Sequence, residues 1–267
     1  ALPLSLRNRV VVQLERCVAT HLAEYLGDVE LHLAQYNIAT LRHPMDHPET
    51  ASFVEFLDAV NQAADASPGF VWRHGIDSRN VDDPAPYENP LTLVNASVWE
   101  SLGALRDYAY KGIHRDVFRR RQDWFVASEA VMWWVPAGAI PSLDECKARL
   151  EFLLRHGLSP FAFETGQRYP QLVVVARPLD HPDVAPMLAE LDRELLDSTP
   201  DGGSNFLHIA PEHVEDGNGA FYIAYLDGVP SACGAYRRID GVDGAAEVKR
   251  MWADPAQRGN KLGAAVL

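Results

Sequence analysis

The sequence predicts an α+β protein made of two units in tandem. Segments with the two-residue alternation of β-strands are interleaved with segments whose apolar residues recur every three to four positions, as in amphipathic helices. A stretch rich in proline, glycine and aromatic residues, 158–170, shows neither period and is predicted to be a linker. A length of 267 residues with 47% apolar residues is sufficient for two cores.

The first unit, predicted at residues 31–165, has the order strand, helix, strand, strand, helix, strand, and one further helix follows. This order is the ferredoxin-like βαββαβ plan. Asp46 and Ser101 are candidate N-caps, and Gly157 is expected to end the last helix. The strands are expected at 31–39, 67–75, 90–100 and 130–138, and the helices at 46–65, 101–125 and 142–157.

A helical extension at residues 1–30 is predicted before the first unit, with its helix from Leu6 to Leu26. The second unit is predicted at residues 171–267. It begins with a strand and a helix, and a hairpin turned at Asp227–Gly228 and a last strand follow. The expected ranges are 171–179 for the first strand, 181–197 for the helix, 219–240 for the hairpin and 245–254 for the last strand.

Charge and cysteine content narrow the class of protein. A net charge of −13 argues against nonspecific binding to nucleic acid or to anionic membranes. The three cysteines, Cys17, Cys146 and Cys233, form no CxxC pair and are expected to be free thiols of a reducing compartment. With no apolar run of membrane-spanning length, we expect a cytoplasmic protein without nucleic-acid or membrane partners.

The stretch PAQRGNKLGAAVL, residues 255–267, follows a predicted strand and opens a helix. Gly259 and Gly263 allow a ligand to approach the backbone closely. The first turn of a helix presents unpaired N–H groups, and Arg258 and Lys261 add positive charge. These features suit a pyrophosphate group, and the alternative is an ordinary strand–turn–helix connection.

This loop resembles the acetyl-CoA loop of the GNAT acetyltransferases, which reads Gln/Arg-x-x-Gly-x-Gly/Ala between a strand and a helix. Lys261 stands where the first glycine of that pattern is expected. The stretches AFYIAYLDGVPSACGAYRRID and AEVKRMWADPAQRGNKLG resemble the central strands of the same family, so the resemblance covers about residues 171–267. It implies acetyl transfer from acetyl-CoA to the amine of a small molecule. The family continues beyond the loop, so we expect this chain to be a fragment that is inactive by itself.

The resemblance also implies roles for single residues. Glu247, on the strand before the loop, is the expected base for the amine, and the alternative is a carboxylate paired with Lys249 or Arg250. Backbone N–H groups of Met251 or Ala253 are expected to polarise the thioester carbonyl. The expected pyrophosphate ligands are Arg258, Gly259, Asn260, Lys261, Leu262 and Gly263.

Residues 31–165 resemble a bacterial family of unknown function that is related to the dimeric α/β-barrel superfamily, which includes antibiotic-biosynthesis monooxygenases. The stretches HLAQYNIA, SPGFVWR, LVNASVWES, HRDVFRRRQDWF and MWWVPAG carry this resemblance. It implies a homodimer whose two sheets form a barrel, with a pocket between helices and sheet. The candidate pocket residues are Asn95, Trp99, Tyr108, His114, Trp124 and Trp133.

Histidines and tryptophans allow three further expectations. Some relatives bind haem through a helix histidine, but a packed histidine is the expectation for His114 in mid-helix, and haem is not expected. Trp133 and Trp134 are neighbours on a strand and must face opposite sides. The prolines around His43 and His47 break the helical spacing of a zinc pair, so no metal site is expected.

Two interpretations of function follow from the two resemblances. One is an acetyl-CoA-dependent N-acetyltransferase with an accessory barrel. The other is a small-ligand-binding or monooxygenase-like barrel that carries a non-catalytic GNAT remnant.

Overall fold

A computed structural model of the chain describes residues 30–75, 87–166, 169–198, 209–215, 217–239, 241–242 and 245–266. The chain divides into two compact units. The first unit comprises Val29–Leu158 with Ala162–Arg168, and the second unit comprises Ser159–Phe161 with Tyr169–Leu267. The helix predicted from Leu6 to Leu26 lies outside the described residues. No helix in the described ranges is long and apolar enough to cross a membrane.

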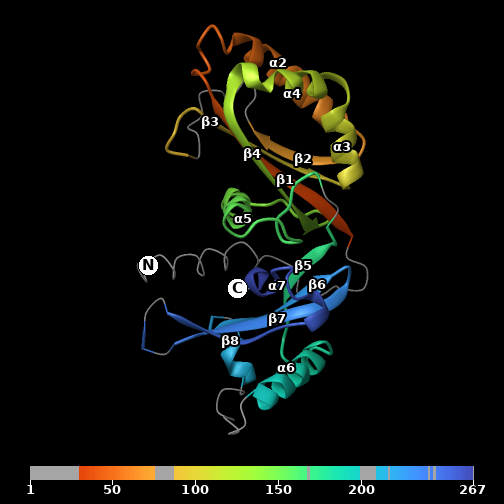
Figure 1. Ribbon diagram of the computed structural model, residues 1–267, viewed down its shortest axis with the longest axis vertical. Coiled ribbons are helices and arrows are strands. Elements are labelled where there is room, and N and C mark those ends of the chain that lie inside the picture. Colours follow the sequence, from red (N-terminus) through yellow and green to blue (C-terminus); the bar gives the residue numbers. More distant parts are fainter. Residues whose placement is uncertain are drawn as a thin grey trace. The chain divides into compact units, whose positions relative to one another are not determined.

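The first unit is a four-stranded antiparallel sheet with helices on both faces (Figure 1). Its strand order is β2-β3-β1-β4, with helices after β1 and β3, which confirms the predicted ferredoxin-like plan. The strands are β1 Leu31–Leu41, β2 Phe70–Gly75, β3 Thr92–Trp99 and β4 Phe125–Pro136. The helices are α2 Ala51–Asp65, α3 Leu102–Tyr110, α4 Gly112–Trp124 and α5 Leu143–His156.

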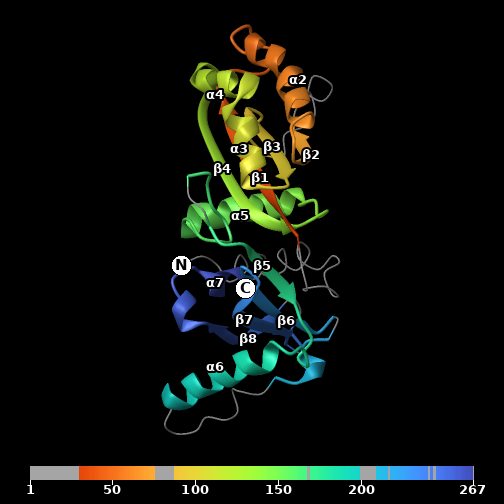
Figure 2. The same ribbon diagram turned by 90° about the vertical axis from the view of Figure 1, so that its right-hand side faces the viewer.

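Alternation along the strands decides which helices cover which face of this sheet. Leu41 of β1 packs with Phe53 of α2 and Trp124 of α4. On the opposite face, the indole N–H of Trp133 donates to the Glu145 carboxylate of α5 at 3.0 Å. Figure 2 shows α2 and α4 together at one end of the unit and α5 at the other end.

The single helix predicted at 101–125 is wrong, because the structure has two helices there. Ser101 caps α3 as expected, since its hydroxyl accepts the Ala104 N–H at 3.1 Å. Lys111 is extended, with φ −121° and ψ 164°, and Gly112 has φ +55°. At this break α3 ends and the chain changes direction, and α4 begins at Gly112. His114 therefore lies in the first turn of α4 and not in mid-helix.

The start of α2 also differs from the prediction. Asp46 is not its N-cap, because the helix begins at Ala51 with Thr50 in the cap position. Residues before it form turns, in which the His47 N–H donates to the Pro44 carbonyl at 3.0 Å. At the other end of the unit, Gly157 ends α5 with φ +73°, as predicted.

Part of the predicted linker belongs to the first unit. Phe163 exchanges two backbone hydrogen bonds with Met132 of β4, at 2.8 and 3.0 Å, and is buried. Its ring also lies 6.1 Å from that of Trp134. Trp133 and Trp134 therefore have separate partners on opposite faces of β4, which confirms the prediction from strand alternation.

The second unit is a separate antiparallel sheet of four strands in the order β5-β6-β7-β8 (Figure 1). The hairpin between β6 and β7 turns at Asp227 and Gly228, both with positive φ, as predicted. The elements are β5 Leu172–Ala176, α6 Val184–Ser198, the short turn η2 Pro211–His213, β6 Gly219–Leu226, β7 Val229–Arg238, β8 Ala246–Ala253, η3 Pro255–Gln257 and α7 Leu262–Ala265.

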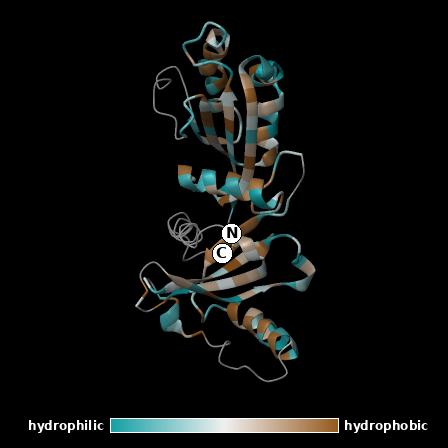
Figure 3. Cartoon of the chain, turned by 60° about the vertical axis from the view of Figure 1, so that its left-hand side comes forward, coloured by the Kyte–Doolittle hydropathy of each residue, from teal (hydrophilic) through white to brown (hydrophobic). Residues whose placement is uncertain are grey.

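Helices cover both faces of the second sheet. Val184 and Met187 of α6 pack with Phe221, Ile223 and Cys233 on one face. On the opposite face, a Cβ at Gly234 would lie 2.4 Å from the Met251 sulfur and 3.1 Å from Val266, so a larger residue would have to displace the Met251 side chain. In Figure 3 the helices carry both hydrophilic and hydrophobic residues, as expected when one side of each faces a sheet.

Candidate functional site

The two central strands of the first unit carry a polar cluster within an otherwise apolar face. In the β1–β3 register, Asn37 lies opposite Asn95 and Gln35 lies opposite Ser97. The Asn37 side-chain carbonyl accepts from the Gln35 amide at 2.8 Å and from the Asn95 amide at 3.2 Å. We call these residues, together with Trp99, the amide–indole cluster.

The amide–indole cluster continues as a chain of hydrogen bonds. The Trp99 indole N–H donates to the Ser97 hydroxyl at 2.9 Å, and this hydroxyl donates to the Gln35 carbonyl at 2.9 Å. Trp99 and Ser97 are buried, whereas Gln35, Asn37 and Asn95 are half-buried. The amides therefore form a partly open polar strip above a buried indole.

An aromatic column connects this cluster to the helices. The ring of Tyr108 on α3 lies 5.0 Å from that of Trp99, with 24° between their planes. His114 on α4 lies 4.6 Å from Tyr108, and Phe118 lies 6.5 Å from His114. Burial raises the pKa of Tyr108, and its hydroxyl donates to the Val60 carbonyl at 3.3 Å. The phenol is therefore neutral and fixed in place.

The tautomer of His114 follows from its partner. Nδ1 lies 2.9 Å from the Ala109 carbonyl, which can only accept, so Nδ1 carries the proton. Burial lowers the pKa of His114, and this hydrogen bond opposes the shift. The ring is therefore neutral at pH 7. In the part of the chain that the structure describes, its Nε2 lone pair makes no hydrogen bond.

The structure brings together four of the six residues predicted for the barrel pocket. Asn95, Trp99, Tyr108 and His114 are neighbours, as the preceding contacts show. Trp124 lies in the Leu41–Phe53 cluster and donates to Ser52. Trp133 lies on the other face of the sheet, against α5. Sequence reasoning missed Gln35 and Asn37, although two amides at inward positions of an apolar strand are a signal for such a cluster.

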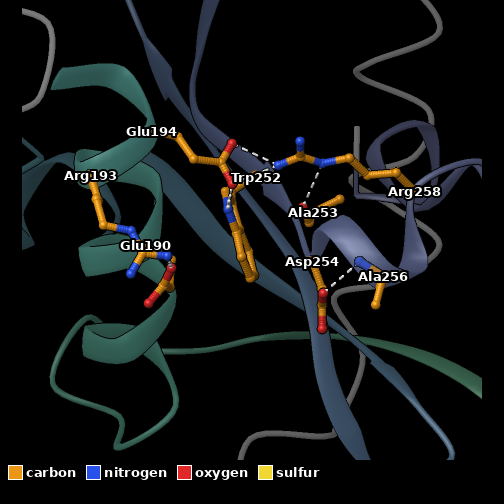
Figure 4. A network of polar contacts seen from close by, with 8 residues as sticks. All are labelled: Glu190, Arg193, Glu194, Trp252, Ala253, Asp254, Ala256 and Arg258. Atoms are coloured by element: carbon orange, nitrogen blue, oxygen red, sulfur yellow. Dashed lines mark hydrogen bonds and ion pairs between the residues drawn. The ribbon is translucent and has the colours of Figure 1, made fainter. Parts of the chain in front are cut away.

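The loop after β8 is tied to α6 through one carboxylate (Figure 4). Both oxygens of Glu194 accept from the Arg258 guanidinium, at 2.7 and 2.6 Å, and one accepts the Trp252 indole N–H at 3.2 Å. Arg258, and then Trp252, lower the pKa of Glu194. The Arg258 charge is thus compensated within the chain. No local pattern in the sequence points to Glu194.

Several backbone N–H groups of this loop have no hydrogen-bond partner among the described residues. Among the described residues, the N–H groups of Gly259, Lys261, Leu262 and Gly263 donate no hydrogen bond. Gly259 has φ +96°, and Lys261 has φ +59° in the left-handed region that glycine favours. Within the same residues the Lys261 ammonium forms no ion pair. By contrast, Asn260 donates its amide to Gln257 at 3.2 Å.

The strand before the loop contains a β-bulge. Between the pairs Ala235–Lys249 and Cys233–Trp252, two residues of β8 oppose one residue of β7, and Arg250 has φ +56°. Arg250 is buried and pairs with Asp192 of α6 at 2.5 Å. The bulge separates Glu247 from Met251 and Ala253, and the Ala253 carbonyl accepts from Arg258 at 3.1 Å.

Glu247 lies in an ion pair. The Arg237 guanidinium donates to its carboxylate at 2.7 Å, and the Lys249 ammonium lies 3.8 Å away. Arg237 is the main cause of a lowered pKa for Glu247. This geometry is the alternative that the sequence raised, with Arg237 in the place expected for Arg250. The role of Glu247 as a base stays a prediction.

The turn before α2 brings together two histidines that the sequence analysis had set aside. Pro44 and Pro48 keep this segment out of a helix, as expected. The imidazoles of His43 and His47 nevertheless stack with their centroids 4.2 Å apart. The two rings therefore lie side by side on a turn and not on a helix, and the expectation of no metal site stays a prediction.

A family described as a domain of unknown function, DUF3291, matches residues 32–175, more than half of the chain. The chain belongs to the DUF3291 family. The match spans the whole sheet of the first unit, which we therefore call the DUF3291 unit. It ends at residue 175 and says nothing about the GNAT resemblance of the strands that follow. A search of curated proteins found no match.

Solved structures similar to this chain cover about two fifths of it. They include the NE2512 protein of unknown function from Nitrosomonas europaea, with 12% identity and a TM-score of 0.32 over 43% of this chain and 99% of that one. SnoaB from Streptomyces nogalater, a cofactor-independent oxygenase, has 17% identity and a TM-score of 0.30 over 42% and 96%. Rv0793 from Mycobacterium tuberculosis has 14% identity and a TM-score of 0.31 over 42% and 99%.

Proposed function

We propose that the DUF3291 unit binds a small planar molecule at the amide–indole cluster, with His114 as a base. The neutral His114 ring, with an unengaged Nε2 beside Tyr108 and Trp99, carries this proposal. Aromatic faces favour stacking with a planar ligand. The half-buried amides of Asn37 and Asn95 supply donors and acceptors that orient it.

The chemistry available at this site is proton abstraction. A neutral imidazole accepts a proton from a phenol or an activated C–H group of the ligand, and the Ala109 carbonyl stabilises the resulting imidazolium through Nδ1. The catalytic form of this proposal is a monooxygenase-like reaction in which molecular oxygen converts an activated CH₂ group of the ligand to a carbonyl. The second oxygen atom leaves as water, and the ligand supplies the electrons. Haem is not part of this proposal.

Titration with 1-naphthol, followed by tryptophan fluorescence, tests this proposal. Asn95→Ala is expected to weaken binding by about tenfold, equivalent to the loss of one well-placed hydrogen bond. Trp124→Phe is the control, because this indole lies in a separate cluster. Equal affinity of the Asn95→Ala and Trp124→Phe variants, or no binding by the wild type, contradicts the proposal.

A second function is favoured by the loop after β8. We propose that the second unit binds acetyl-CoA and that the acetyl group is transferred to a small-molecule amine. The observation that supports it is the set of unfilled N–H groups at Gly259, Lys261, Leu262 and Gly263, directly after a bulged strand. Successive free N–H groups in left-handed turn geometry are suited to a pyrophosphate.

Within this second proposal the side chains of Lys261, Arg258 and Glu247 have different roles. The Lys261 ammonium supplies charge, whereas Arg258 stays with Glu194 and holds the loop in place. Glu247, kept ionised by Arg237, is the proposed acceptor of the amine proton. Backbone N–H groups of Met251 or Ala253 are the proposed donors to the thioester carbonyl.

Calorimetric titration with acetyl-CoA tests the second proposal. Gly263→Ala is expected to weaken binding by about tenfold, since a Cβ obstructs close approach of a phosphate. The fold accommodates this Cβ, whose nearest neighbour would be the Met251 methyl at 3.9 Å. Gly103→Ala in α3 is the matched control. Failure of the chain to bind acetyl-CoA contradicts the proposal, and Glu247→Gln, which lies outside the loop, should leave this affinity unchanged.

We propose a homodimer through the DUF3291 unit. The first half of β4 is exposed, and Val126 retains 58% of its accessible surface, which is unusual for an apolar strand residue. Light scattering should give twice the chain mass of 29.6 kDa for the wild type and a lower mass for Val126→Lys. A mass of one chain for the wild type at micromolar concentration contradicts the proposal.

A further inference from the structure

The turn between β1 and α2 gathers three groups that commonly bind metals. One ring nitrogen from His43, one from His47 and one carboxylate oxygen of Glu49 lie within 4.8 Å of one another. His43 Nε2 lies 3.1 Å from Glu49 Oε2. The two imidazoles are nearly parallel, with 16° between their planes. All three side chains reach solvent, so an ion can enter from outside.

Backbone hydrogen bonds and Thr50 hold most of this turn, and His47 adds one long bond by accepting the Glu49 N–H at 3.2 Å. The His47 N–H donates to the Pro44 carbonyl at 3.0 Å, and the Thr50 N–H donates to the His47 carbonyl at 2.9 Å. The buried Thr50 hydroxyl donates to the His43 carbonyl at 3.4 Å. Two prolines restrict φ within the same segment. Because most of these bonds do not involve the three side chains, we expect the turn to keep its shape when those side chains are replaced.

We propose that His43, His47 and Glu49 bind a divalent transition-metal ion, with Zn²⁺ as the reference ion, and leave further positions to water. Two imidazoles and one carboxylate are a ligand set that zinc accepts. Metal bonds of about 2.0–2.1 Å place tetrahedral ligands roughly 3.3 Å apart, so the side chains close by roughly 1.5 Å at most. Half-exposed side chains on a turn can make this movement by rotation about their χ angles.

The hydrogen bonds of the turn are compatible with the binding of a metal ion. His47 Nδ1 accepts the Glu49 backbone N–H at 3.2 Å, so its lone pair already points toward Glu49. A metal ion replaces this long hydrogen bond and the contact between His43 and Glu49. The carboxylate offsets part of the ion's charge, and the net charge of −13 favours cations in general.

Titration of the full chain with Co²⁺ and Zn²⁺ tests the proposal. Co²⁺ in a site with nitrogen and oxygen ligands shows visible absorption that reports its coordination, and Zn²⁺ should displace it. We expect one equivalent of tight binding in the wild type. Glu49→Gln should weaken binding by about tenfold or more, because loss of an outer-shell partner alone costs about 10- to 100-fold. The double variant His43→Gln with His47→Gln should lose the site.

His74→Gln is the matched control, since His74 is exposed on β2 and its ring stacks on Trp72. This variant should bind Co²⁺ like the wild type, and circular dichroism should show that all variants keep the fold. Wild-type protein without Co²⁺ absorption means that the turn holds only a contact between His43 and Glu49, which overturns the proposal. Equal binding by the double variant and by His74→Gln overturns it as well.

Discussion

Burial lowers the pKa of His114, so this imidazole is harder to protonate than that of an exposed histidine. In the folded chain its pKa is lowered, whereas the unfolded chain has an ordinary histidine pKa of about 6.5. As the pH falls below about 6.5 toward the lowered pKa, the unfolded state binds more protons than the folded state. The free energy of unfolding should therefore decrease when the pH falls from 7.5 to 5.5. Urea unfolding should show a smaller decrease in His114→Gln.

The exposed histidine at position 74 provides the control for this prediction. His74→Gln should retain the pH dependence of the wild type, because this exposed position leaves the buried His114 unchanged. An identical pH dependence in the wild type and in His114→Gln would show that His114 is not the group responsible.

Cys233 illustrates the opposite effect of burial on an acid. It is fully buried, its thiol donates to the Arg250 carbonyl at 3.5 Å, and burial raises its pKa to about 12. The thiolate is the reactive form, so we expect no reaction with an aromatic disulfide reagent at pH 8 in the folded state. A Cys17→Ser variant leaves Cys146 and Cys233, both buried. Two thiols should react in urea, and rapid labelling without urea contradicts the prediction.

At the scale of elements, the break between α3 and α4 depends on one glycine. Gly112 has φ +55°, and a Cβ there would meet no atom within 4 Å. Gly112→Ala should therefore lower the free energy of unfolding by about 1–2 kcal/mol through backbone strain alone. Gly103→Ala, inside α3 and without positive φ, should instead be neutral or stabilising. Urea unfolding of both variants checks this, and shifts in the same direction contradict it.

The sequence predicts strands better than helix ends in this protein, for physical reasons. The alternation in β1 and in the β6–β7 hairpin is local, and so is the turn at Asp227 and Gly228. The break at Gly112 cannot be predicted from the sequence pattern. A glycine inside a helix lowers its stability by only about 1 kcal/mol and does not disturb the apolar period. At the start of α2, both Asp46 and Thr50 are cap-forming types, and only the turn built by the prolines selects Thr50.

At the scale of the whole molecule, the candidate sites depend on pairs that are distant in sequence. Asn37 and Asn95 are 58 residues apart, and Glu194 and Arg258 are 64 apart. No local pattern relates such residues, so the sequence could nominate Asn95 or Arg258 but not their partners. His43 and His47 are close in sequence, yet their contact depends on a turn and not on a periodic element.

Each of the two units has its own hydrophobic core, so we predict that one unit can be destabilised without destabilising the other. Ile223 is fully buried against α6 in the second unit, and Ile223→Ala should destabilise that unit by about 2–5 kcal/mol. Five of the six tryptophans lie in the DUF3291 unit and the sixth is Trp252. In a Trp252→Phe background, tryptophan fluorescence therefore reports only the DUF3291 unit, whereas circular dichroism reports both. Ile223→Ala should lower the urea midpoint by circular dichroism and leave the fluorescence midpoint unchanged. An equal shift of both midpoints would mean that the two cores unfold as one.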